Sequence, residues 1–408
     1  GEINLDSTLA EYAPDAPFPN AVHPDDVTLR DLLTHTSGIS NDPIAFRSAY
    51  TGEHTPELLW RLLGVSEVNE DAPHGTFQYT NTGYNILTVL TDRELGVRWQ
   101  ELIAREIIEP AGMTRTSASM LQAAQEGWSV ARPHMPSPDG EGMARVYLEK
   151  IDATMQSAGG MIMSANDALL WLELLVNDGE VGGRQIIPAE AVRETRARLA
   201  EVDLQFGDYL REDYGLGWYV SSYGGDEMIH HFGGFAGFRA HVSYMPEREV
   251  GVAVFTNNSV VGSFLADAVA NYAYDRLAGR EEGAEPRAAI IASLSERHDV
   301  IVSQIASGRA DRAGRTWTLS QPIEAYTGVY ESPEMGTMTV IIEENTLVAH
   351  LGVLRATAEP FTVPDSIRVE LVPLSGMVIV FDVNDDGEVI AASLNGEARF
   401  ERRPGSVL

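Results

Sequence analysis

The texture of the chain changes at about Pro322, and this change limits what the chain can fold into more than any other feature. Before it, helical stretches alternate with short β runs and glycine-rich turns, whereas after it short β runs follow one another at regular intervals. The first pattern is typical of an α/β or α+β domain, and the second of a small antiparallel barrel or sandwich. Because 408 residues are also too many for one core of about 250 to 300 residues, we expect two domains.

A segment rich in charged residues separates the two textures. It holds a helical pattern whose apolar residues from Ile290 to Ile305 fall on one face. We therefore predict an α/β domain over residues 1–279, a helical linker over 280–320 and an all-β domain over 321–408.

Two local patterns in the first part predict particular elements. A helix follows Ser164, which is placed as its N-cap with Asp167 as the reciprocal partner of a capping box, and its leucines Leu169, Leu172 and Leu175 fall on one face. This helix is expected to pack in the core.

Further along, two β runs at about 238–245 and 250–256 are joined by "MPERE" and predict an antiparallel hairpin.

The charge of the chain bears on its partners. Sixty acidic residues against 29 basic ones give a net charge of -31, which repels phosphate backbones and anionic membrane surfaces. We therefore expect no nucleic acid as a partner. Lys150 is the only lysine, and this depletion fits either a salt-adapted surface or a GC-rich coding bias.

Several kinds of site are absent from the sequence. Without cysteine there is no disulfide, thiol nucleophile or thiolate metal site, and no apolar run reaches the length of a membrane span. The patterns G-x-S-x-G, H-E-x-x-H and G-x-x-x-x-G-K-[ST] do not occur. The adjacent His230 and His231 would point to opposite faces of a strand, which is poor geometry for a shared metal. We predict no cofactor and no metal.

The stretch "DVNDDGEV" has the first spacings of a calcium loop. Its twelfth position is Ser393 rather than glutamate, and its flanks are strands rather than helices. We interpret it as a hairpin turn at Asp386 and Gly387.

The stretch "LLTHTSGIS" places His35 two residues before Ser37. The two could be drawn as a base and a nucleophile, but such a pair also needs an orienting group and an oxyanion site. We favour a tight turn in which Gly38 takes a backbone angle that other residues resist, while short polar side chains bond local backbone groups.

Tyr79 and Asn81 lie in a polar loop directly before an expected helix over residues 82–95. The positive potential of a helix N-terminus can lower the pKa of a phenol, which would suit a catalytic tyrosine. The alternative is that Asn81 or Thr82 only caps the helix.

The stretch "HHFGGFAGFRA" interrupts a strand with Gly233, Gly234 and Gly237. Such an edge suits a substrate that is added as a further strand, with a free N–H directed at an oxyanion. Arg239 on the same hairpin would meet either a substrate carboxylate or a surface ion-pair partner.

Four ordered segments, "LRDLLTHTSGIS", "FQYTNTGY", "SAGGMIMSANDALLWLELLVNDG" and "HFGGFAGFRAHVSYMPEREVGVAVFTNN", resemble the serine β-lactamase-like family. This group includes class C β-lactamases, penicillin-binding-protein-related D-aminopeptidases and carboxypeptidases, and esterases. The resemblance implies an α/β (α+β) domain with an antiparallel sheet flanked by helices, and the tail from about residue 322 is similar to a lipocalin-like barrel often appended in the family. It also favours a periplasmic or secreted protein.

The resemblance assigns roles to five residues. Tyr79 and Asn81 match the family's Y-x-N element, which makes the tyrosine the general base and later acid, and the asparagine a contact to the substrate amide. His231 and Gly233 match the H-x-G variant of the K-T-G element, and the N–H of Gly234 would be an oxyanion-hole donor.

One family element is absent, because no serine in this sequence has a lysine three residues later. "GEINLDSTL" corresponds to a segment that follows the catalytic helix in relatives, so we expect the nucleophile to lie upstream and this chain alone to be inactive. We also expect open sheet edges.

Two functions remain open. One is a serine hydrolase acting on peptides with D-residues, β-lactams or small esters, and the other is a non-catalytic descendant that binds a ligand or partner. A homo-oligomer is compatible with both, and the barrel could cover the cleft, bridge subunits or stabilise the fold.

Overall fold

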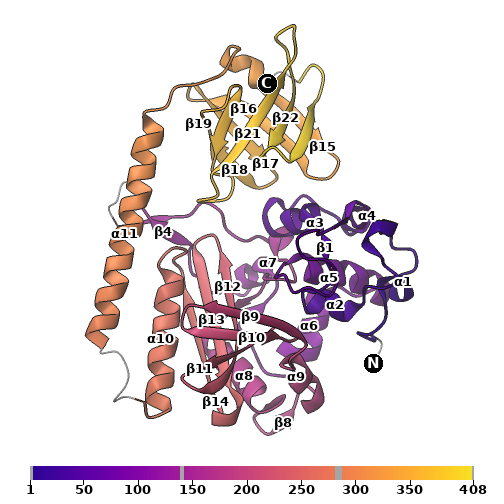
Figure 1. The fold of residues 1–408 in the computed structure, drawn as a ribbon, viewed down its shortest axis with the longest axis vertical. Coiled ribbons are helices and arrows are strands. Elements are labelled where there is room, and N and C mark those ends of the chain that lie inside the picture. Colours follow the sequence, from indigo (N-terminus) through magenta and orange to yellow (C-terminus); the bar gives the residue numbers. More distant parts are fainter. Residues whose placement is uncertain (1–2, 138–141, 281–286, 407–408) are drawn as a thin grey trace.

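The structure, a computed structural model, describes residues 3–137, 142–280 and 287–406. Figure 1 shows a lower part in which helices pack beside a twisted sheet, an upper part that is a barrel-like sheet, and the long helix α11 that runs along one side and joins them. The α/β domain and the all-β domain are both present, as the change of texture predicts.

A helical region precedes the sheet. Helices α2 (Leu29–Leu33) and α5 (Thr82–Leu95) cross closely in its centre, since a Cβ on Gly83 would come within 2.2 Å of the Leu32 carbonyl oxygen. Leu32, Ile86 and Leu90 are fully buried in the core between them. The other helices of the lower part are α1 Leu9–Tyr12, α3 Asp42–Phe46, α4 Pro56–Leu62, α6 Trp99–Ile103, α7 Met120–Gln125 and α9 Ala189–Thr195.

A six-stranded antiparallel sheet forms the other half of this part, in the order β14-β13-β12-β11-β10-β9. The predicted hairpin is confirmed at β13 and β14. In the described part of the chain β14 pairs only with β13 and β9 only with β10, so both ends of the sheet are open edges, as expected. The strands are β9 Ala200–Phe206, β10 Tyr209–Tyr214, β11 Tyr219–Tyr223, β12 Asp226–Phe235, β13 Phe238–Met245 and β14 Val250–Thr256.

Helices α8 (Ala165–Val176) and α10 (Gly262–Leu277) cover opposite faces of this sheet. Leu174 of α8 packs with Ile229, whereas Tyr274 of α10 packs with Met228, the preceding residue of the same strand. Because neighbouring residues of a strand point to opposite faces, the two helices lie on opposite sides.

The start of α8 agrees only in part with the sequence. Ser164 caps the helix by accepting from the Asp167 N–H, as predicted. The Asp167 carboxylate instead accepts from the Arg115 N–H and the Thr116 hydroxyl, so the reciprocal half of the capping box is wrong. The expectation that Leu169 lies in the core is also wrong, since it is 65% exposed. The helical spacing places Leu169 on the same side of the helix as Leu172. It cannot show whether the sheet extends far enough to cover Leu169.

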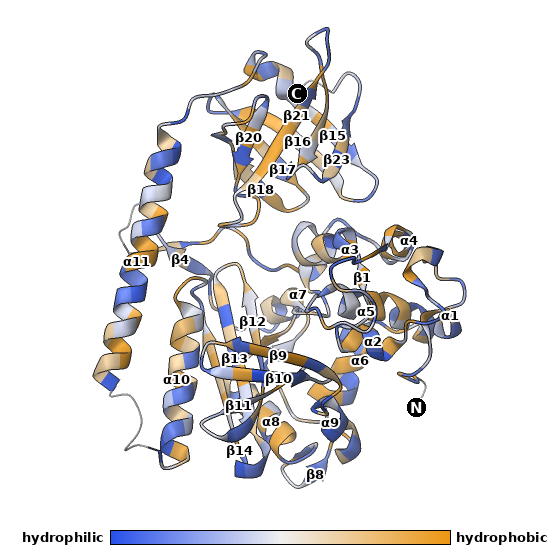
Figure 2. Ribbon diagram, viewed as in Figure 1, coloured by the Kyte–Doolittle hydropathy of each residue, from blue (hydrophilic) through white to orange (hydrophobic). Residues whose placement is uncertain are grey.

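The linker helix is longer than its pattern indicates. Helix α11 (Arg287–Ala313) has 27 residues and none of them is buried. It lies beside α10, where the Arg297 guanidinium sits 4.8 Å from the ring of Phe264. Figure 2 shows hydrophobic and hydrophilic residues mixed along α11, whereas stretches of the barrel strands are hydrophobic.

The C-terminal part is a nine-stranded, nearly closed antiparallel sheet in the order β18-β17-β16-β15-β23-β22-β21-β20-β19. The predicted succession of short β runs is confirmed, whereas β18 and β19, which have only four and two residues, were not predicted. The strands are β15 Gly328–Ser332, β16 Gly336–Glu343, β17 Thr346–Leu351, β18 Leu354–Thr357, β19 Glu359–Pro360, β20 Ser366–Val369, β21 Met377–Val383, β22 Val389–Leu394 and β23 Ala398–Arg402.

The stretch with the spacings of a calcium loop is a hairpin turn, as predicted. Asp386 and Gly387 lie between β21 and β22, and the Asn384 side-chain oxygen accepts from the N–H groups of Asp386 and Glu388. Within the described ranges, no group of three or more metal-ligating side chains converges, and no helix is both long and apolar enough to cross a bilayer.

The barrel is joined to the lower part by apolar packing and hydrogen bonds. Val146 and Leu148 are buried in the same core as the barrel side chains, and Phe235 packs against that core. The buried Arg47 donates to the carbonyl oxygens of Glu334 and Pro333 on the barrel. The barrel is therefore seated on the far end of β12.

Candidate active site

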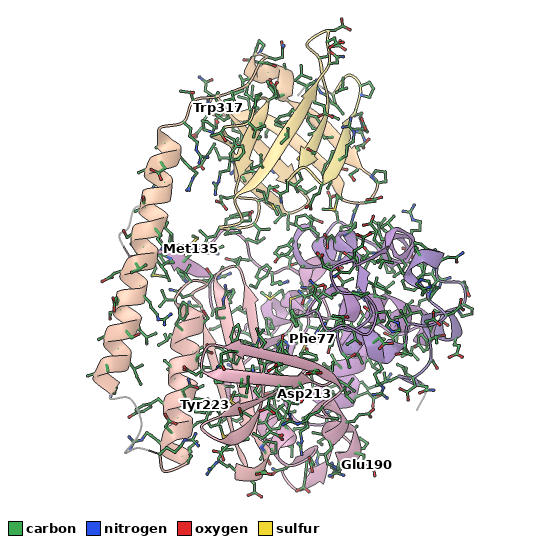
Figure 3. All side chains as sticks on the ribbon, viewed as in Figure 1. Phe77, Met135, Glu190, Asp213, Tyr223 and Trp317 are labelled. Carbon is green, nitrogen blue, oxygen red and sulfur yellow. The ribbon has the colours of Figure 1, made fainter. Side chains whose placement is uncertain are left out.

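Aromatic side chains of the helical region and of the sheet pack together where the two meet, and the surface at Tyr79 and His231 is called the cleft. His35, Phe77 and Tyr79 come from the helical side, and Tyr214, Tyr219 and His231 from the sheet; of these, His35, Tyr214 and Tyr219 are buried. Figure 3 shows Phe77 between the helices and the sheet. The cleft brings together residues that lie more than 100 positions apart in the chain.

Tyr79 stands in this cleft beside two of the residues predicted with it. Its ring centroid is 5.6 Å from that of His231, and its hydroxyl donates to the Asn81 side-chain oxygen at 3.3 Å. Tyr79 is 44% exposed. Asn81 is the N-cap residue of α5 but makes no capping hydrogen bond, while the Thr82 N–H donates to the hydroxyl of Thr80. The interpretation of Asn81 or Thr82 as only a helix cap is therefore wrong.

The predicted lowering of the phenol pKa is also wrong. Burial raises the pKa of Tyr79 to about 12, and the neighbouring Tyr219 adds to this, while the charge of Arg211 opposes it. The N-terminus of α5 does not outweigh the effect of burial on the phenol. Tyr79 is therefore a neutral phenol at neutral pH, and it would need a further cation beside it to act as a base.

His231 is a neutral imidazole directed into the cleft. Burial lowers its pKa to about 4, and its Nδ1 lies 3.0 Å from the Phe232 carbonyl oxygen. Since a carbonyl only accepts, Nδ1 carries the proton and Nε2 is left as an acceptor. His230 points to the other face, where its Nε2 meets the Ser221 hydroxyl, so the prediction of opposite directions is confirmed.

Residues His231 to Phe235 form a free strand edge beside these side chains. Strand β11 pairs with β12 only from Asp226 to His230, so the next five residues have β13 on one side and, among the residues that the structure describes, no strand on the other. An extended peptide could add here as a further strand.

The register of the hairpin directs the backbone of Gly234 toward this edge. Ala236 and Gly237 connect Phe235 to its partner Phe238, and such a two-residue turn closes on a hydrogen-bonded pair. Hydrogen-bonded and non-hydrogen-bonded pairs then alternate, so Gly234 belongs to a non-hydrogen-bonded pair and its N–H points away from β13. Gly233 and Gly234 are both exposed. This gives the geometry of an oxyanion donor at the predicted residue.

His35 and Ser37 do not form a catalytic pair, as expected. Ser37 is buried, and its hydroxyl accepts from the Ile39 N–H at 3.3 Å. Gly38 has φ 64°, a left-handed backbone angle as predicted. A Cβ there would come within 2.4 Å of the backbone nitrogen of His74. His35 has φ 59° as well, a strained angle that the sequence did not predict.

His35 supports the loop that carries Tyr79. Its carbonyl accepts from the Gln78 N–H at 2.9 Å and its Nδ1 from the Thr80 N–H at 3.4 Å, so both neighbours of Tyr79 are bonded to it. Its Nε2 lies 3.1 Å from the Tyr214 hydroxyl. Sequence reasoning missed this role, because Tyr214 is 179 positions away and no local pattern links the two residues.

Arg211 is a second residue that the sequence did not indicate. Its guanidinium carbon lies 3.8 Å from the ring centroids of both Phe206 and Tyr219, and its buried Nε has no hydrogen-bond partner in the described chain. Burial lowers its pKa, which still leaves an arginine charged. Arg211 is therefore a permanent positive charge that is buried against the rings of Phe206 and Tyr219.

A Ser–His–Asp arrangement on the other face of the sheet is not an active site. The Asp267 carboxylate lies 2.9 Å from His241 Nδ1, and His241 Nε2 lies 2.7 Å from the Ser243 hydroxyl. Ser243 is fully buried, and its hydroxyl also bonds that of Tyr274 at 2.8 Å. A substrate carbonyl cannot reach it, so this chain of bonds stabilises the packing of α10.

The helical region and the antiparallel sheet with its free edge together define a β-lactamase-like domain. The profile of the Beta-lactamase family matches residues 1–276, and the chain belongs to this family.

Three known proteins illustrate the relationship. Penicillin-binding protein 4 of Amycolatopsis lactamdurans is 24% identical over 269 residues, which are 65% of this chain and 69% of that protein. The D-alanyl-D-alanine-carboxypeptidase/endopeptidase AmpH of Escherichia coli K12 is 22% identical over 65% of this chain and 67% of its own length. The octameric penicillin-binding protein homologue from Pyrococcus abyssi superposes with a TM-score of 0.55, over 98% of this chain and 83% of that one, at 20% identity, which shows a shared fold.

Proposed function

We propose that this chain carries the substrate-binding cleft of a serine hydrolase that cleaves amide or ester bonds through an acyl-enzyme. The free edge of β12 carries this proposal, because His231 at its start lies beside Tyr79 and the N–H of Gly234, three residues further along the same edge, points away from β13. In the proposed reaction the Gly234 N–H stabilises the oxyanion. Asn81 holds the substrate amide, and Tyr79 moves the proton to the leaving group.

Peptides with D-residues, β-lactams and small esters are the proposed substrates. The family and the names of the penicillin-binding protein and carboxypeptidase relatives support the first two classes. The proposed nucleophile is a serine with a lysine three residues later, and no such pair occurs in these 408 residues. We therefore assign both residues to sequence outside them.

Covalent labelling tests this function. The 408-residue chain and the longer gene product that contains a Ser-x-x-Lys element are each treated with a fluorescent penicillin and a fluorophosphonate. We expect labelling of the longer product only, with Tyr79→Phe slowing acylation by at least about a hundredfold because a proton-transfer group is lost.

Two results would contradict the proposal. Labelling of the 408-residue chain that disappears in Ser37→Ala or Ser243→Ala would place the nucleophile inside this sequence. A longer product with Ser-x-x-Lys that is never labelled by either reagent would argue against an acyl-enzyme.

The second candidate is a binding protein without catalysis. The observation in its favour is that Tyr79 and His231 are both neutral at pH 7, with pKa values of about 12 and about 4. A gene that encodes no Ser-x-x-Lys element would support this candidate.

A homo-oligomer is also part of the proposal. The octameric state named for the Pyrococcus abyssi homologue supports it, as do the half-exposed Ile291 and Val300 on α11. Light scattering coupled to gel filtration would give the number of subunits.

A further inference from the structure

A cavity of about 280 Å³ lies behind the free edge of β12. Phe232 lines it, and because Phe232 directly follows His231 in the strand, the two side chains point to opposite faces. His231 faces Tyr79, so the cavity and Tyr79 lie on opposite sides of β12. Ligand pockets usually measure about 300 Å³ or more, so this cavity suits a small ligand.

Arg239 borders this cavity and has no acidic partner among the described residues. Its guanidinium crosses over Gly234, where a Cβ would come within 2.7 Å of Nη1, and one N–H donates to the Phe238 carbonyl at 2.9 Å. Within the described part of the chain Arg239 forms no ion pair, so the sequence alternative of a surface ion pair is wrong. A guanidinium has five N–H donors, so most of them remain free for a ligand.

Asp267 of α10 lines the same cavity but does not reach Arg239. Its Oδ1 lies 2.9 Å from Nδ1 of His241, whose Nε2 is in turn 2.7 Å from the Ser243 hydroxyl, so the carboxylate is held in place. Its Oδ2 has no hydrogen-bond partner among the residues that the structure describes, and its side chain is 28% exposed. The cavity therefore presents a cation and an anion that are each fixed by another group and are too far apart for an ion pair.

The rest of the cavity wall is largely apolar. Phe206 of β9 and Phe232 pack with ring centroids 5.8 Å apart, and Ala240 and Ala266 also line the cavity. The guanidinium carbon of the buried Arg211 lies 3.8 Å from the ring centroid of Phe206, which holds that ring in place. An apolar group of a ligand would be covered by these two rings.

We propose that this cavity binds a free α-amino acid with an apolar side chain. The carboxylate of the amino acid accepts from Arg239, its ammonium donates to Oδ2 of Asp267, and its side chain lies against Phe206 and Phe232. A simple anion or cation would leave one of the two charged groups without a partner and the rings uncovered. A zwitterion with an apolar side chain satisfies all three parts of the wall.

The position of the cavity links it to the edge of β12. The backbone of Gly233 and Gly234 forms part of its wall, so the bound amino acid contacts the residues that form the free edge. Cleavage of the proposed peptide substrates releases amino acids, so the site takes a product of that reaction. This link alone rests on the proposed function, because binding needs neither the nucleophile nor the cleft.

The simpler interpretation is that Arg239 and Asp267 are only solvated side chains at the ends of a hairpin and a helix. It predicts that no ligand binds through both of its charges. Binding measurements with the 408-residue chain separate the two interpretations, and they need no catalysis.

Calorimetric titrations with methionine and two derivatives provide the test. Methionine is the probe because its thioether packs well against aromatic rings. Its N-acetyl derivative lacks the ammonium, methioninamide lacks the carboxylate, and each compound is used in the L and the D form. We expect methionine of at least one hand to bind at least about tenfold more tightly than either derivative, since each derivative loses a charge-assisted contact.

Two variants test the two charged groups separately. Arg239→Gln should remove the preference over methioninamide, and Arg239→Lys, which keeps the charge, should retain part of it and serves if Arg239→Gln fails to fold. Asp267→Asn keeps an acceptor for His241 and should remove the preference over N-acetylmethionine. The matched control is Asp275→Asn on the same helix, whose carboxylate lies 3.2 Å from Arg280 and which should leave both preferences intact.

Equal binding of methionine and both derivatives, including no binding of any of them, overturns the site. Preferences that survive in both Arg239→Gln and Asp267→Asn overturn it as well, because the amino acid would then bind elsewhere. Failure of the longer gene product to form an acyl-enzyme would instead count against the proposed function, and it would leave these binding results unchanged.

Discussion

At the scale of single residues, the cleft is built from neutral side chains. Burial lowers the pKa of His35 to about 3 and that of His231 to about 4, and it raises the pKa of Tyr79 to about 12. Each ring contacts another ring rather than a carboxylate. The charge of Arg211 lies near Tyr79 and opposes the rise of its pKa, but the pKa stays at about 12, so Tyr79 needs a further cation to act as a base at neutral pH.

The depressed histidine pKa values predict that the fold loses stability in acid. In the unfolded chain His35 binds a proton below about pH 6.5, whereas in the folded chain it stays neutral down to about pH 3. The unfolded state therefore binds more protons in this window. As a result, the free energy of unfolding falls by about 1.4 kcal/mol for each pH unit by which the pH is lowered. Urea unfolding at pH 7, 6, 5 and 4.5 measures this slope.

The variant His35→Gln should reduce the slope by about 1.4 kcal/mol per pH unit, since it removes one titrating group. Ser37→Ala is the control, because it changes a neighbouring buried residue that does not titrate in this range. An unchanged slope in His35→Gln would mean that His35 is protonated in the folded protein.

The sequence indicated the residues that belong to local motifs. It did not indicate residues whose role depends on contacts made in the folded chain. Tyr79, Asn81, His231, Gly233 and Gly234 stand in motifs, and the structure brings them to one cleft, although their catalytic roles stay predictions. His35 was missed because its partner Tyr214 lies 179 positions away, and Arg211 was missed because no motif marks a buried cation that stacks on rings of neighbouring strands.

At the scale of elements, the close crossing of α2 and α5 positions the loop of Tyr79. Helix α5 begins three residues after Tyr79, and α2 ends two residues before His35. The hydroxyl of Tyr84 on α5 donates to the Leu33 carbonyl at 2.9 Å and ties the two helices together. A shift between these helices would move both sides of the loop.

Gly83→Ala tests this crossing. Its new Cβ would come within 2.2 Å of the Leu32 carbonyl oxygen, a backbone atom that cannot turn aside. We expect a loss of about 1 to 3 kcal/mol in unfolding free energy, which outweighs the gain of about 1 kcal/mol in helix propensity. Urea denaturation gives the value.

Gly159→Ala is the matched control, because a Cβ at Gly159 would meet nothing within 4 Å. Its effect should stay within about 0.5 kcal/mol. If both variants were equally stable, the helices would have room to separate and the crossing would not position the loop.

Elements whose apolar residues recur at regular spacing were predicted correctly. The contacts that these elements make with other segments were predicted less well. The hairpin of β13 and β14 and the longer strands of the barrel follow from the local pattern of the sequence. The exposed Leu169 and the unmade half of the capping box at Asp167 did not follow, since each depends on what another segment offers nearby.

At the scale of the whole molecule, the barrel and the lower part share a core. Val146 and Leu148 come from the loop that also carries Lys150, and they are buried among barrel side chains. The Tyr147 hydroxyl donates to the Leu371 carbonyl on the barrel. The barrel therefore fixes the loop that carries Lys150 and stabilises the fold there.

Arg47 joins the barrel to the lower part through hydrogen bonds. It is 4% exposed, donates to the barrel carbonyls of Glu334 and Pro333, and donates to the Glu53 carbonyl at 2.6 Å. Arg47→Met keeps the apolar stem but leaves these carbonyls without their donor, which costs on the order of 2 to 4 kcal/mol. Because the lost contacts lie between the two parts, we expect the barrel and the lower part to unfold in separate calorimetric transitions.

The control for Arg47→Met is Arg355→Met, which removes an arginine bonded to Glu343 on the barrel surface. It should change stability by no more than about 0.5 kcal/mol and leave the transitions coupled. A single transition that shifts equally in both variants would show that the two parts are held together by the shared apolar core at Val146 and Leu148, and that Arg47 adds nothing to their coupling.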